Sequence, residues 1–132
     1  MPIPFPKIKK MPKCRTKEDC VDLAKKITRA KGACECCGRL PDAYNPLDGA
    51  HIVPVRHSHT AADLRNLLCL RRDCHIYWTA HPLEFEEFVE NKWPGRLIEM
   101  RQKARTNRGR PDWDSLHTSL TDEQKRLDHG NR

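Results

Sequence analysis

Residues 17–31 have the apolar and polar pattern of a helix. Their apolar positions fall at helical spacing, a capping-box sequence precedes them and a glycine follows them. These positions are Leu23, Ile27 and Ala30, with Thr16-Lys-Glu-Asp19 before them and Gly32 after them. Lysine and arginine side chains fill the second half of the stretch, so the predicted helix is basic.

Residues 50–55 are the clearest strand candidate, because they form a short apolar run next to turn-forming residues. Prolines, aspartates and a glycine make residues 39–49 a loop or an irregular hairpin. Residues 56–65 are polar and predict a connection rather than a buried element. The sequence therefore places little strand in the first half of the chain.

Short helices separated by proline and glycine are predicted in the second half. Asp73 can cap the first of them, and Pro82 both ends that helix and starts the next. The second predicted helix buries Phe85 and Phe88 and ends at Pro94-Gly95. The other predicted elements are helices over 74–80, 96–106 and 120–128, and a linker over 107–112.

The length of 132 residues suits one domain with tails, and a content of 37% hydrophobic and 33% charged residues implies a modest core. A structural metal is therefore an expected supplement to the core. We predict a basic, proline-rich arm over 1–16 and a domain over 17–106 whose motifs lie in 34–81. Residues 107–132 are predicted to be a polar C-terminal tail.

The net charge of +7 suggests a polyanionic partner, and its distribution points to DNA. Residues 34–81 hold five basic and five acidic residues, whereas 1–17 hold six basic and no acidic ones, and 92–110 hold seven basic and one acidic. Basic flanks around a neutral centre suit a site that grips a phosphate backbone. The candidate nucleic-acid-binding residues are Lys25, Lys26, Arg29, Arg101, Lys103 and Arg105.

Seven cysteines are present, and no signal peptide or membrane-spanning run is visible, which predicts a cytoplasmic protein whose cysteine pairs hold metal. Cys34 and Cys37 have the spacing with which two thiolates reach one Zn²⁺, and Cys69 and Cys74 could complete the set. Cys36 could replace either of its neighbours. The alternatives are buried thiols or a labile disulfide. Two further cysteines, Cys14 and Cys20, are predicted to be free thiols.

The order of motifs in the centre of the chain resembles the HNH endonuclease family, and its phage-type members in particular. The resemblance rests on Cys34-Glu-Cys-Cys-Gly38, Gly49-Ala-His-Ile-Val-Pro54, Asn66-Leu-Leu-Cys69 and Asp73-Cys-His75. It implies a small α+β fold, in which a ββα-metal core carries a structural zinc site and is flanked by helices. It also implies a DNA-cleaving enzyme of phage or prophage origin, acting in a bacterial or phage-infected host cell.

The resemblance implies a role for each central polar residue. His51 is the general base that takes a proton from the attacking water, since a neutral histidine suits that task. Asn66 braces the loop after the strand. The catalytic cation, Mg²⁺ or a transition metal, is held by His75 and by His81 as second ligand.

One departure bears on activity, because Ala50 stands where the family usually has a metal ligand. Asp48 or His57 could supply the missing ligand, while His57 and His59 are otherwise expected to face solvent or DNA. Three functions follow: a metal-dependent DNA endonuclease, a structure-selective phage recombination or junction nuclease, and a zinc-stabilised DNA-binding protein with an impaired active site. The sequence does not indicate the oligomeric state.

Overall fold

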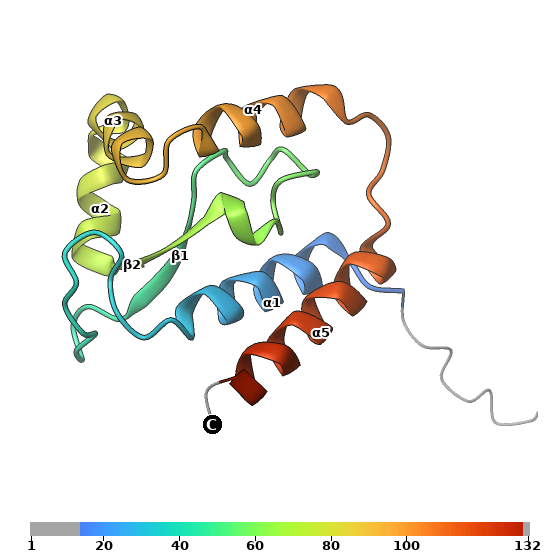
Figure 1. The fold of residues 1–132 in the computed structure, drawn as a ribbon, viewed down its shortest axis with the longest axis horizontal. Coiled ribbons are helices and arrows are strands. Elements are labelled where there is room, and N and C mark those ends of the chain that lie inside the picture. The colour runs from blue at the N-terminus through green and yellow to red at the C-terminus, as the bar shows by residue number, and fades with distance from the viewer. Residues whose placement is uncertain (1–13, 131–132) are drawn as a thin grey trace, which may run out of the picture.

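The computed structural model describes residues 14–130, so most of the predicted arm over 1–16 lies outside the described residues. Within these residues, five helices and two strands follow one another, with a short 3₁₀ turn, Leu64–Asn66, leading into the second strand (Figure 1). The elements are α1 (Lys17–Arg29), β1 (Leu47–His51), β2 (Leu67–Arg71), α2 (Arg72–Ala80), α3 (Pro82–Lys92), α4 (Arg96–Thr106) and α5 (Trp113–Gly130). The predicted α+β class is confirmed.

β1 and β2 form an antiparallel two-stranded sheet in which Leu47 pairs with Arg71 and His51 pairs with Leu67. The strand was predicted over 50–55, which is three residues too late at its start, and the sequence pattern did not indicate β2. The ladder ends at His51 because the next residues bond elsewhere: the amide of Val53 donates to the side chain of Asn66 at 2.8 Å. β2 runs directly into α2, which completes a ββα unit.

α1 begins with the predicted capping box, although it ends at Arg29 rather than near 31. The Thr16 hydroxyl accepts a hydrogen bond from the Asp19 amide at 3.2 Å, and the Asp19 carboxylate accepts one from the Thr16 amide at 2.9 Å. The two bonds satisfy amides that the first turn of a helix leaves free. One side of α1 packs on the sheet and another packs on α5.

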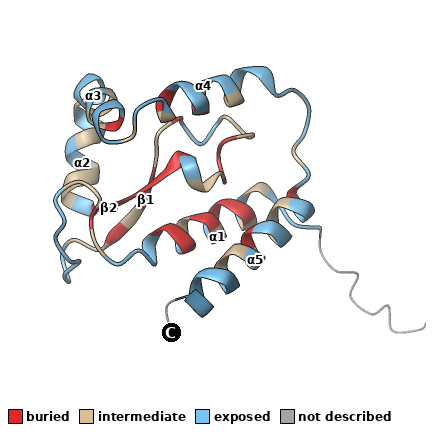
Figure 2. Cartoon of the chain, viewed as in Figure 1, coloured by how far each residue is buried: buried red, intermediate tan, exposed pale blue. Residues whose placement is uncertain are grey.

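α5 is longer than the predicted helix over 120–128, and it is not a detached tail. Its buried residues Trp113 and Leu120 share an apolar cluster with α1. The thiol of Cys20 in α1 donates to the carbonyl of Trp113 at 3.2 Å. Only a narrow stripe of α5 faces α1, and Figure 2 shows how few positions of this helix are buried. The sequence pattern of this polar segment therefore indicated a helix only weakly.

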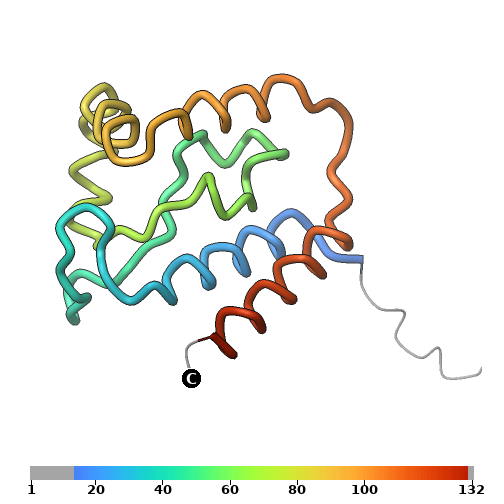
Figure 3. Tube along the Cα trace, viewed as in Figure 1, coloured from blue at the N-terminus to red at the C-terminus, as the bar shows by residue number. Residues whose placement is uncertain are grey.

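A second apolar cluster lies where α3 and α4 cover the other side of the sheet. α3 starts at Pro82 and α4 at Arg96, as predicted. α2 starts at Arg72, two residues earlier than predicted, and Asp73 accepts a bond from the amide of Cys74 inside the first turn instead of capping from outside. The sheet therefore lies between two pairs of helices, α1 and α5 on one side and α3 and α4 on the other (Figures 1 and 3). Between residues 14 and 130, no helix has both the length and the hydrophobicity needed to cross a membrane.

Candidate active site and cysteine cluster

His51 ends β1 with a half-buried imidazole that is held at one nitrogen. Its Nε2 lies 2.7 Å from the backbone carbonyl of Ala61. A carbonyl only accepts hydrogen bonds, so Nε2 carries the proton and donates it. The lone pair is then on Nδ1, which can accept a proton from a water molecule.

The surroundings of His51 favour its neutral form. Burial is the largest cause of a pKa below the ordinary value of 6.5, and the positive charges of Lys25, His75 and Lys17 add to it. The hydrogen bond to Ala61 acts in the opposite direction but does not outweigh them. At neutral pH the imidazole is therefore an unprotonated base.

Asn66 ties down the loop that follows His51. Its side chain is fully buried, accepts a bond from the Val53 amide at 2.8 Å and donates bonds to the carbonyls of Val53 at 3.0 Å and Thr60 at 2.9 Å. The Ile52 amide also donates to the backbone carbonyl of Asn66 at 2.9 Å. Because Ala61 lies in this loop, Asn66 fixes the carbonyl that holds His51.

We expect Asn66→Ala to lower the free energy of unfolding by about 3 kcal/mol, because buried partners on Val53 and Thr60 would lose their bonds. Urea unfolding of the purified protein measures this. Asn107→Ala is the matched control, since Asn107 donates only to a carbonyl at the exposed end of α4 and its loss should cost less than about 0.5 kcal/mol. Equal unfolding midpoints for the two variants would contradict the bracing role.

His75 of α2 and Asp48 of β1 lie side by side in the wall of a shallow hollow of about 440 Å³. His75 Nδ1 lies 3.1 Å from Asp48 Oδ2, and the Arg72 guanidinium lies 3.1 Å from the other carboxylate oxygen. Although partial burial acts to raise it, hydrogen bonds from Arg72 and His75 lower the pKa of Asp48 below its usual value. The hollow thus holds an ionised carboxylate and an imidazole side by side.

With its Nδ1 proton removed, His75 could hold a divalent cation together with Asp48. Two neighbouring ligands around a cation bound at about 2.1 Å lie about 3 Å apart, which is close to the separation of these two donor atoms. Asp48 and Ala50 are two residues apart on one strand and therefore face the same way. The carboxylate of Asp48 accordingly stands on the strand face where Ala50 offers no ligand.

The structure does not bring His81 to this pair. Its ring stacks on Tyr77 at 4.2 Å between centroids, and its Nδ1 contacts the Tyr77 carbonyl at 2.8 Å. His59 contacts the carbonyl of Gly109 at 2.9 Å. A ligand role for His81 therefore remains a prediction.

Three of the predicted zinc ligands come together. The thiols of Cys34, Cys37 and Cys74 all lie within 4.8 Å of one another, and they are the one group of three or more possible ligand atoms found so close within residues 14–130. Burial acts to raise the pKa of Cys37, but hydrogen bonds from Arg39 and the other two thiols lower it to about 6. A thiolate is therefore available at neutral pH, and the donor set fits a soft cation such as Zn²⁺.

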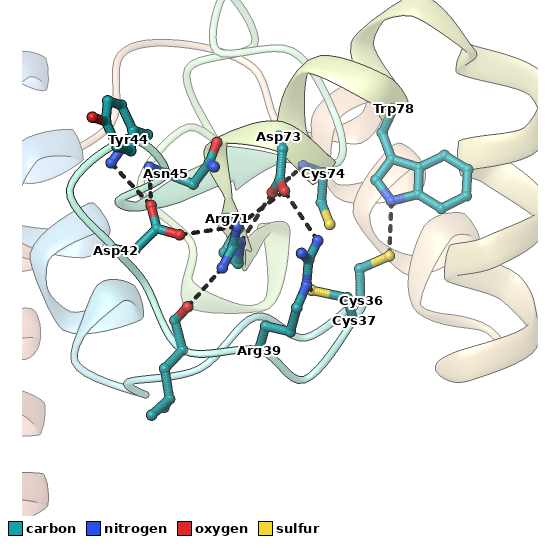
Figure 4. Close-up of polar contacts among 11 residues, drawn as sticks. Cys36, Cys37, Arg39, Asp42, Tyr44, Asn45, Arg71, Asp73, Cys74 and Trp78 are labelled. Carbon is teal, nitrogen blue, oxygen red and sulfur yellow. Dashed lines mark hydrogen bonds and ion pairs between the residues drawn. The ribbon is translucent and has the colours of Figure 1, made fainter.

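The fourth predicted ligand, Cys69, lies outside this group. It sits in the middle of β2 with no exposed surface, opposite Gly49, whereas Cys74 lies in the first turn of α2. Burial and the charge of Glu35 raise the pKa of Cys69 to about 11, so it stays a neutral thiol. Cys36, next to Cys37 in sequence, is also outside the group, and its sulfur accepts a bond from the Trp78 indole at 3.4 Å (Figure 4).

Sequence reasoning missed an arginine network that frames the cysteines (Figure 4). Arg71 is 6% exposed, donates to the carbonyl of Leu40 at 2.9 Å and pairs with Asp73 at 3.2 Å and Asp42 at 3.4 Å. Arg39 pairs with the same Asp73 at 3.0 Å and donates to the sulfur of Cys37 at 3.4 Å. The network joins the loop before β1 to the start of α2. Asp73 is a local partner of Arg71, but Leu40 and Asp42 come from a distant segment, so no local pattern marks the network.

The predicted nucleic-acid-binding residues divide into two groups. On α4, Arg101 pairs with Glu86 and Lys103 pairs with Asp63, while Arg105 is exposed. On α1, the residues predicted to bind DNA form no ion pair with any described residue, and Lys25 alone of them is half-buried. The α1 group is Lys25, Lys26 and Arg29.

Comparison with known proteins gives one match. Residues 34–86 match the family model described as HNH endonuclease. The matched segment contains the cysteine group, both strands, α2 and the residues around His51 and His75. No curated protein and no solved structure matches the chain.

Proposed function

Since residues 34–86 belong to the HNH endonuclease family, we propose that the chain is a metal-dependent DNA endonuclease in which His51 is the general base. The observation that carries this proposal is the orientation of His51. Its Nε2 is occupied by the Ala61 carbonyl, which leaves Nδ1 as the acceptor, and its environment keeps the ring neutral. A residue that only filled space would need neither feature. We further propose residues 17–106 as the nuclease domain, with α5 supporting α1 from behind.

In this proposal His51 Nδ1 removes a proton from the water that attacks the phosphodiester. The Ala61 carbonyl stabilises the imidazolium that forms, because it accepts a stronger hydrogen bond from the charged ring. Asn66 holds the loop that carries Ala61 and so keeps the ring oriented. Such positioned general-base catalysis contributes roughly 10²–10⁴ in rate.

We propose His75 and Asp48 as the residues that hold the catalytic cation, with His81 as a further candidate on the α2 side. A divalent cation bound there, Mg²⁺ or a transition metal, supplies charge stabilisation for the phosphate and for the leaving oxygen. The proximity of Asp48 Oδ2 and His75 Nδ1 supports this assignment. The three thiols of Cys34, Cys37 and Cys74 would hold a structural Zn²⁺ at the start of α2, where Cys74 directly precedes His75.

The pH dependence of cleavage should report the lowered pKa of His51. Below that pKa the imidazole is protonated and cannot accept a proton, so the rate should fall as the pH falls. Since the pKa lies below 6.5, the half-maximal rate should also lie below pH 6.5. Single-turnover cleavage measured from pH 5 to 8 tests this. A half-maximal rate above pH 6.5 would assign the fall in rate at low pH to another group. The same conclusion would follow if the residual activity of His51→Ala fell in the same way at low pH.

A DNA-binding protein with an impaired active site is the second candidate, and Ala50 favours it. Ala50 is 2% exposed within the apolar cluster, so its position contributes packing and no ligand. A metal-dependent nicking assay run beside a gel shift separates the two candidates, because only the nuclease converts supercoiled DNA into the open-circular form. The narrower hypothesis of a phage recombination or junction nuclease calls for branched and linear duplexes to be compared in the same assay.

A further inference from the structure

α1 makes a close approach to β1 at a single glycine next to the active site. A Cβ on Gly49 would lie 2.8 Å from Cγ of Lys25 and 3.1 Å from its Cα, too near for any side chain at that position. The stem of Lys25 therefore lies directly on β1. Gly49 and His51 are two residues apart, so Lys25 rests on the strand face that carries His51.

Lys17 reaches the same region from the start of α1. Its ammonium lies 3.3 Å from the hydroxyl of Ser58, which belongs to the loop after His51. Lys17 and Lys25 are both half-buried. The two lysines thus approach His51 from one helix, one beside the strand and one beside the loop.

Neither lysine has a carboxylate partner among residues 14–130. The ion pairs nearby involve other cations, such as Arg72 with Asp48 and Lys103 with Asp63. Partly buried lysines without a counter-ion in the protein favour an anion from outside it. The pKa of His51 is lowered mainly by burial and further by the charges of Lys25, His75 and Lys17. The contribution of Lys17 and Lys25 agrees with their position close to His51.

We propose that Lys17 and Lys25 form a phosphate-binding site beside His51 that holds the DNA phosphate at the point of cleavage. The inference rests on the proposed nuclease function and deepens it. β1 pairs only with β2 among the described strands, and residues 48 and 51 point to opposite faces of it. A DNA backbone that passes the end of β1 at His51 would have the lysines of α1 on one side of the strand and His75 with Asp48 on the other. Ammonium groups suit this task as compact charges for phosphate oxygens.

Methionine at each lysine position removes the charge and keeps most of the stem that packs on β1. For Lys25→Met we expect the cleavage rate at saturating DNA to fall roughly 10²-fold, as when a donor to developing transition-state charge is lost. Lys25→Arg should restore most of the rate. Each methionine variant should also reduce the salt slope of duplex binding by about 0.9. Lys125→Met is the matched control, because Lys125 is an exposed lysine on α5, which packs against α1, and it should change neither quantity.

A second readout does not depend on cleavage. Adding a short DNA duplex should shift the His51 ring resonances in the NMR spectrum of the wild type, and the shift should be lost in the Lys17→Met/Lys25→Met double variant. A resonance shift without cleavage under any metal would reject the nuclease and retain the phosphate site. A wild-type protein that cleaves without the shift, or a Lys25→Met variant with an unchanged rate at saturating DNA, would overturn the phosphate site.

Discussion

Replacing His51 with alanine is expected to reduce DNA cleavage by roughly 10²–10⁴ while leaving the catalytic cation bound. The imidazole contacts the Ala61 carbonyl through Nε2, and the proposed ligand pair of Asp48 and His75 stands on the other face of β1. A general base acts on water and does not have to touch the cation. The loss should therefore appear in the rate and not in the affinity for metal.

His75→Ala should behave differently, because it removes a proposed ligand. We expect it to lose both cleavage and the weaker of two bound metals, while the cysteine-bound metal stays in place. Calorimetric titration of Mn²⁺ into each variant, together with single-turnover cleavage, separates the two roles. His129→Ala, at the exposed end of α5, is the control for loss of a histidine and should match the wild type in both measurements.

Loss of the cation in His51→Ala would reverse the assignment. His51 would then be a ligand that compensates for Ala50, and the general base would have to be sought elsewhere. His57 and His59 would be the first candidates.

Removal of the cysteine-bound metal is expected to unfold the centre of the chain. Structural zinc contributes about 10–16 kcal/mol of binding free energy in zinc-finger peptides, which exceeds the stability of many small domains. Cys34, Cys37 and Cys74 connect the loop before β1 to α2, so their cross-link holds together elements that share a modest core. Elemental analysis should find about one Zn²⁺ per chain in the folded protein.

Serine variants test which thiols are ligands. Cys37→Ser and Cys74→Ser should lose zinc and cooperative unfolding, whereas Cys14→Ser, at an exposed thiol, should keep both. Cys69→Ala should also keep zinc, since Cys69 lies outside the thiol group. A folded preparation free of zinc would contradict the structural role, and loss of zinc in Cys69→Ala would return Cys69 to the ligand set.

The elements that sequence predicts best here are those with local signals. α1 is set by the capping box at Thr16, and α3 is set by Pro82, which fixes its own backbone for the first turn. The strand predicted over 50–55 ran on too far because the end of β1 depends on Asn66. The side chain of Asn66, thirteen residues away in sequence, accepts the hydrogen bond of the Val53 amide, so that this amide does not join the ladder. α5 was underestimated because its stability comes from packing on α1 rather than from its own composition.

The candidate site likewise has features that sequence could predict and features that depend on tertiary contacts. The candidate roles of His51, Asn66 and His75 could be predicted from sequence because their order and spacing resemble those of the HNH family. The pairing of Asp48 with His75 depends on the alternation of β1 and on how α2 packs, and sequence offered it only as one of two options. The environments of Arg71 and Lys25 could not be predicted, because they depend on tertiary contacts. Arg71 contacts Leu40 and Asp42, and Lys25 packs on Gly49.

Nicking of a supercoiled plasmid, with and without added Mg²⁺, Mn²⁺ or Ni²⁺, tests the central claim most directly. The zinc-loaded wild-type protein should produce open-circular DNA only when one of these cations is present, and His51→Ala should produce almost none. Tight DNA binding in a gel shift, with no nicking under any of the cations, would contradict the claim and identify a DNA-binding protein whose active site is impaired.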